Sequence, residues 1–140
     1  MQGISTLCPA YPVYWPFLRQ GEEKQNEENE TMKILFTASE CVPFCKTGGL
    51  ADVVGALAPV LAKKGHDVRV MLPLYSMIPH DYVAQMKHVI DFEVELGWRK
   101  QYCGIEALEK DGVTYYFIDN KYYFGRSYIY GMGGDEYERY

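Results

Sequence analysis

A short loop around residue 47 carries the residues of this sequence best suited to binding an anion. It reads Lys46-Thr47-Gly48-Gly49. Paired glycines let the backbone approach a phosphate without a Cβ atom in the way, and the lysine adds a mobile cation. The segment is neither a Walker loop nor the GxGxxG dinucleotide fingerprint. A tight turn that merely starts a helix explains the same tetrapeptide, so the spacing alone leaves both interpretations open.

Asp52, which follows the loop, also has two interpretations. An acid in the first turn of a helix interacts favourably with the helix dipole. Close to a phosphate, however, its carboxylate would repel the ligand. We therefore expect Asp52 to face sugar hydroxyls or another part of the loop rather than a diphosphate.

The segments on either side of the loop predict a parallel βαβ unit. Residues 33–38 (KILFTA) read as a strand buried on both faces, and residues 67–72 (DVRVML) as a second strand. The helix between them should bend at Pro59 and end at Gly65. Its buried face is predicted from helical spacing to consist of Leu50, Val53, Val54, Leu57 and Leu61. Ligands of open α/β sheets bind beyond the carboxyl ends of the strands, which is where the loop lies.

The second half of the chain predicts a hairpin and one more strand. Residues 92–98 alternate apolar with polar or small residues, residues 102–108 read as a returning strand, and residues 113–118 as an apolar strand. Residues 121–140, rich in Gly and Tyr, read as loop. The predicted fold class is α/β, a Rossmann-like, doubly wound and mostly parallel sheet with a β-hairpin insertion.

Two groups of side chains have a functional interpretation beside a structural one. Tyr and Phe are concentrated in residues 113–140, where they either stack on sugar rings or pack in the core and loops. Cys45 precedes the loop lysine at a helix N-terminus, where a reactive thiolate would be favoured. The alternative is that Cys45 is a small buried apolar residue.

Composition excludes several classes of function. The net charge is −5 and no basic stripe is present, so we expect no nucleic-acid partner. No apolar run is long enough to span a bilayer, so we expect no membrane partner. The four cysteines form no CxxC pair and the histidines lie far away along the chain, which predicts reduced thiols and no metal site. We also expect no cofactor. Three prolines interrupt the apolar residues 1–20 and no basic region precedes them, so we expect a cytoplasmic location rather than a secretory signal. Residues 1–31 read as a disordered tail or a mis-set start, and residues 32–140 as the domain.

Longer motifs make the chain resemble a known family. From residue 32 to about the C-terminus it is similar to glycogen and starch synthases of glycosyltransferase family 5. The resemblance rests on Glu40, Pro43, the block KTGGLADV at residues 46–53, GHDV at 65–68, PLY at 73–75, FIDN at 117–120, FGR at 124–126 and Tyr130-Gly131. Gly125 stands where the family often has an acid, so no acceptor residue is assigned there.

The resemblance implies transfer of glucose from ADP-glucose or UDP-glucose to the non-reducing end of an α-1,4-glucan, with retention of configuration. It also implies two Rossmann-like domains with the active site between them, of which this chain would be the incomplete N-terminal one. The substrate-binding residues it implies are Lys46, Thr47, Gly48, Gly49 and Asp52, and no catalytic residue is assigned. With a C-terminal domain and its E-x7-E motif missing, we expect the chain to be inactive alone. The alternative is a non-catalytic module that binds sugar nucleotide or glucan and acts with a partner chain.

Overall fold

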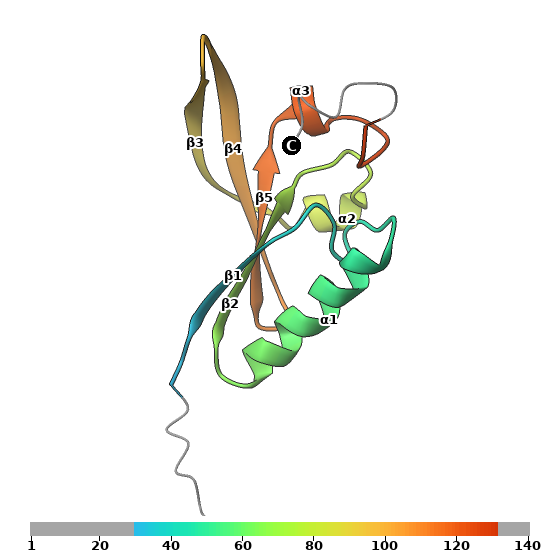
Figure 1. Ribbon diagram of the computed structural model, residues 1–140, viewed down its shortest axis with the longest axis vertical. Helices are drawn as coiled ribbons and strands as arrows, with labels where there is room; N and C mark the ends of the chain where they lie inside the picture. The colour runs from blue at the N-terminus through green and yellow to red at the C-terminus, as the bar shows by residue number, and fades with distance from the viewer. Residues whose placement is uncertain (1–29, 132–140) are drawn as a thin grey trace, which may run out of the picture.

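The computed structural model describes residues 30–131, so nearly all of the tail predicted at residues 1–31 lies outside the described residues. A five-stranded sheet has the order β1-β2-β5-β4-β3 (Figure 1). Strands β1 (Lys33–Thr37), β2 (Asp67–Pro73) and β5 (Val113–Asp119) are parallel. Strands β3 (Lys87–Leu96) and β4 (Arg99–Lys110) form an antiparallel hairpin beside β5. The predicted α/β sheet with a hairpin insertion is confirmed.

In the part of the chain that the structure describes, three helices accompany the sheet. Helix α1 (Gly49–Lys63) joins β1 to β2 and continues through Pro59, and Gly65 follows its end at φ +95°, as predicted for a terminating glycine. The single-turn helices α2 (His80–Val83) and α3 (Lys121–Phe124) were not predicted, and α3 lies in a segment expected to be loop. Within residues 30–131 no helix has the length and apolar character needed to cross a membrane.

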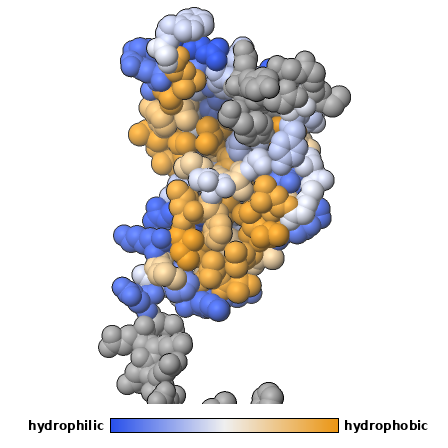
Figure 2. All heavy atoms as spheres, viewed as in Figure 1, coloured by the Kyte–Doolittle hydropathy of each residue, from blue (hydrophilic) through white to orange (hydrophobic). Residues whose placement is uncertain are grey.

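The face of α1 that packs on the sheet differs in part from the prediction. Val54 is buried and Leu61 packs against the core, as predicted, but the fully buried residues of the helix are Ala51 and Ala58. The side chains of Leu50, Val53 and Leu57 are 45%, 60% and 42% exposed. Small residues on the inner face let the helix approach the sheet closely, so the larger residues on the adjacent stripe face solvent. Apolar surface gathers over the part of the view in Figure 2 where α1 lies.

The prediction that the first strand is buried on both faces is also wrong. Ile34 and Phe36 pack against the core, but Leu35 between them is 56% exposed. Successive side chains of a strand point to opposite faces, and the core with α1 lies on one face only. The core itself is formed by that face of the sheet, with Val70, Leu72, Tyr115 and Phe117 among its most deeply buried side chains.

The hairpin is longer than the sequence indicated. Strand β3 begins at Lys87 and β4 ends at Lys110, whereas the alternating pattern marked only residues 92–98 and 102–108. Phe92 and Leu96 are 44% and 43% exposed, so the alternation identified a strand whose apolar face is open.

Candidate functional site

The loop between β1 and α1 is held in place by a small folded unit. Cys41 and Cys45 exchange two backbone hydrogen bonds, Cys41 N to Cys45 O at 3.1 Å and Cys45 N to Cys41 O at 3.0 Å. Between them Phe44 is buried, and its ring packs edge-on against Tyr115 and Phe117 of β5. This anchor brings the chain back over the carboxyl ends of the strands, so that Lys46 to Gly49 form the entry to α1.

A buried carboxylate fixes the conformation of this loop. Glu40, which is 2% exposed, accepts hydrogen bonds at Oε2 from the Thr47 amide, from the Thr47 hydroxyl at 2.8 Å and from the Gly48 amide at 3.2 Å. On the other side Tyr130 donates to Oε1 of Glu40 at 3.4 Å, and its hydroxyl lies 3.0 Å from Ser39 Oγ. Glu40 therefore joins the loop to a segment ninety residues further along the chain.

The hydrogen bonds keep Glu40 ionised. Burial by itself raises the pKa of this carboxyl, but the bonds from the Thr47 amide and hydroxyl, the Gly48 amide and Tyr130 more than offset it, so the pKa lies below its ordinary value. A charged carboxylate at a helix N-terminus also interacts favourably with the helix dipole. The loop is thus organised around an anion that belongs to the protein.

Lys46 and Asp52 form an ion pair across the outside of the loop. Lys46 Nζ lies 2.8 Å from Oδ1 and 2.7 Å from Oδ2 of Asp52. The side chains are 50% and 55% exposed, so the pair contributes at most about 1 kcal/mol to stability. Asp52 faces another part of the loop, as expected. Because the pair is weak, a phosphate could replace Asp52 as the partner of Lys46 at small cost.

The first turn of α1 completes an anion-binding arrangement. Its N-cap residue is Gly48 in an extended conformation, and no side chain caps the helix there. The first amides of a helix have no intrahelical acceptor, and they carry a partial positive charge. Gly49 is exposed, and a Cβ atom on it would meet nothing within 4 Å. Open space, amides and the Lys46 cation therefore meet at this end of the helix.

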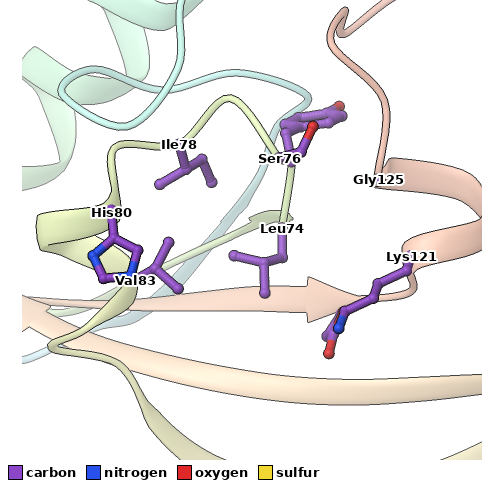
Figure 3. Close-up of a pocket in the computed structure, with 9 residues that line it drawn as sticks. Leu74, Ser76, Ile78, His80, Val83, Lys121 and Gly125 are labelled. Atoms are coloured by element: carbon purple, nitrogen blue, oxygen red, sulfur yellow. The ribbon is translucent and has the colours of Figure 1, made fainter.

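Two cavities lie near the carboxyl ends of the strands. One of about 350 Å³ is bounded by the ends of β1, β2 and β5 and includes Ser39, the neighbour of Glu40. A larger one of about 550 Å³ lies between the segment after β2, α2 and α3 (Figure 3). Its walls are mostly apolar, and its charged or polar groups include Ser76, His80, Asp119 and Lys121. This larger cavity contains none of the five loop residues predicted from the sequence.

Cys45 does not behave as its position suggested. The side chain is 5% exposed, and burial, more than the nearby charge of Glu40, raises the pKa of its thiol. The hypothesis of a reactive thiolate at the helix N-terminus is therefore wrong, and the small buried apolar interpretation holds. Among residues 30–131 no cluster of His, Cys, Asp or Glu is arranged to hold a metal ion.

The structure brings together all five residues predicted for the site and adds three more. Glu40 and Tyr130 were part of the family motifs but had no role assigned from the sequence, and Ser39 was not singled out. No spacing rule links an acid to a loop amide seven residues later, so only the fold reveals this contact. The motif matches at Glu40 and Tyr130 were the signals available in the sequence.

Comparisons with known proteins agree on one family. The model of the starch synthase catalytic domain family matches residues 33–140. A glycogen synthase of Anoxybacillus flavithermus is 60% identical over 104 residues, which is 74% of this chain and 22% of that protein. A glycogen synthase of Streptococcus pneumoniae is 56% identical over 100 residues, 71% of this chain and 21% of that protein.

A solved structure shows the same similarity in three dimensions. The catalytic domain of Starch Synthase IV from Arabidopsis thaliana, bound to ADP and acarbose, superimposes with a TM-score of 0.67 at 27% identity. The match covers 78% of this chain and 24% of that one. This chain spans 21–22% of the length of the two glycogen synthases. The sequence motifs, the sheet with its loop and the family match agree, and the chain belongs to the starch synthase catalytic domain family.

Proposed function

We propose that this chain supplies the sugar-nucleotide-binding loop of a glucosyltransferase. The enzyme transfers glucose from ADP-glucose or UDP-glucose to the non-reducing end of an α-1,4-glucan, with retention of configuration. The observation that supports this most is that Lys46 lies beside the first turn of α1, whose N-terminus has no side-chain cap. The relatives named glycogen synthase and the ADP-bound starch synthase point to the same substrates.

In this proposal the diphosphate of the donor takes over the ammonium group of Lys46 from Asp52. The amides of the first turn of α1 donate hydrogen bonds to the remaining phosphate oxygens. Glu40 keeps its hydrogen bonds to Thr47 and Gly48 and holds the loop in the binding conformation. Asp52, released from the lysine, then faces the sugar hydroxyls.

Binding of ADP-glucose and UDP-glucose to the 140-residue chain tests the proposal by calorimetry. Lys46→Ala should weaken binding about tenfold or more, since the contact is charge-assisted. Lys63→Ala is the matched control, because it removes an exposed lysine from the last turn of the same helix. Equal affinities of the two variants would refute the loop assignment.

A turnover assay on glycogen separates the enzyme from the second candidate, a binding module that acts with a partner chain. If the chain is part of an enzyme, it should bind sugar nucleotide but transfer no glucose by itself. Transfer should appear when the rest of a family enzyme is supplied in trans. Glucan or nucleotide binding that no added domain converts to transfer would favour the module.

A further inference from the structure

The tip of the β3–β4 hairpin presents an exposed indole that the packing of the chain does not explain. Leu96 and Arg99 form the last pair of the hairpin, so Gly97 and Trp98 are its two turn residues. Gly97 has φ +61°, the arrangement of a type II′ turn with glycine first. Trp98 is 93% exposed, the largest exposed fraction among the exposed large apolar side chains of residues 30–131. Hairpin turns ordinarily carry small or polar residues.

The neighbouring side chains form a small aromatic surface around this indole. The Arg99 guanidinium lies 5.9 Å from the centroid of the Trp98 ring and 6.0 Å from that of Tyr123 on α3. Tyr122 packs edge-on against Tyr123 at 5.0 Å and is 57% exposed. Asn120, the N-cap of α3, donates to the Tyr102 carbonyl at 2.7 Å and so fixes α3 against the hairpin.

We infer that this surface, Trp98 with Arg99 and Tyr122, is a distal binding platform for a glucan chain. Flat aromatic rings pack on the apolar faces of sugar rings, and flanking guanidinium and phenol groups hydrogen-bond to hydroxyls. The inference rests on the proposed function, since it takes the acceptor of that reaction as its ligand. The platform and the donor loop lie in different places: the donor loop follows β1, whereas Trp98 lies in the turn between β3 and β4.

The position of the platform suits a polymer rather than the glucose being transferred. The hairpin tip lies at the same end of the sheet as the carboxyl ends of β1, β2 and β5 (Figure 1). Strand β3 is separated from β1 by four strand spacings, about 19 Å at ~4.8 Å each. A glucan chain that binds the platform is held near the donor loop, and this raises the effective concentration of the glucan at the donor loop.

Native gel electrophoresis of the 140-residue chain through glycogen tests the platform. Trp98→Ala should weaken the retardation about fivefold or more, whereas Trp98→Phe, which keeps a flat ring, should change it less than about twofold. Trp98→Leu keeps apolar area without a flat face and should behave like Trp98→Ala. Val53→Ala is the control, an exposed apolar residue on α1.

Three results would overturn the platform: no retardation of the unmodified chain, unchanged retardation of Trp98→Ala, or full retention by Trp98→Leu. A Trp98→Ala change that alters the oligomeric state on size-exclusion chromatography and leaves glycogen binding intact would assign the surface to a protein partner instead. ADP-glucose binding measured on the same samples should not respond to any Trp98 variant. Failure of the donor loop would appear there, in the response to Lys46→Ala, and so remains distinguishable.

Discussion

Glu40 offers the sharpest test of how the loop is built. Glu40→Ala removes the acceptor of four hydrogen bonds, two from Thr47, one from Gly48 and one from Tyr130. Hydrogen bonds to a charged group contribute about 1.5–3 kcal/mol each. Thr47 is exposed and Gly48 half-buried, so water replaces part of what is lost. We therefore expect Glu40→Ala to lower the free energy of unfolding by about 2–3 kcal/mol, and Glu40→Gln, which keeps an acceptor oxygen, by about 1–2 kcal/mol.

The stability contributed by Glu40 should depend on pH in a direction that follows from its pKa. The pKa of Glu40 is lower in the folded chain than its ordinary value, so its contribution to stability is present above the unfolded pKa of about 4.3 and is lost as pH falls through the folded pKa. Urea unfolding of the unmodified chain and Glu40→Gln should show the full difference at pH 7. The difference should shrink below about pH 4.

The control for both measurements is Glu109→Gln, which removes an exposed carboxylate from β4. It should change the unfolding free energy by less than about 0.5 kcal/mol. If Glu40→Ala costs no more than this control, Glu40 does not hold the loop. A difference between Glu40→Gln and the unmodified chain that stays constant as the pH falls would show that its charge has no part in the contact.

Further predictions concern the packing and charges around the loop. Gly55→Ala should destabilise the chain by about 1–3 kcal/mol in urea unfolding, since the new Cβ would clash with the side chain and the carbonyl oxygen of Val42. Gly49→Ala, with open space at its Cβ, should cost less than about 0.5 kcal/mol. Asp52→Asn should shift the same unfolding curve by less than about 1 kcal/mol, because its ion pair is half exposed. Cys45 should react slowly with a thiol reagent at pH 8 and rapidly in urea, as followed by mass spectrometry, because burial raises its pKa. Rapid labelling of the folded chain would contradict this.

The sequence was sufficient to predict the position of the loop between β1 and α1. A buried strand, a glycine pair and an amphipathic helix are local signals, and the rule that ligands bind beyond strand ends gave the loop its place. The hydrogen bonds of Glu40 could not be predicted from such local signals. They join residues 40, 47 and 130, which come into contact only after the sheet has formed. The same holds for the aromatic surface at the hairpin tip, where Trp98 and Tyr122 come from different elements.

Helix α1 shows most clearly why one kind of inference failed. Its apolar residues form two adjacent stripes, one of large residues beginning at Leu50 and one that includes Ala51, Val54 and Ala58. A hydrophobicity argument favours the stripe with the larger residues, because burial energy scales with apolar area. The sheet beneath already carries bulky side chains such as Tyr115 and Phe117. Close packing on that surface requires small residues from the helix, and this complementarity depends on the partner element, which no periodicity within the helix records.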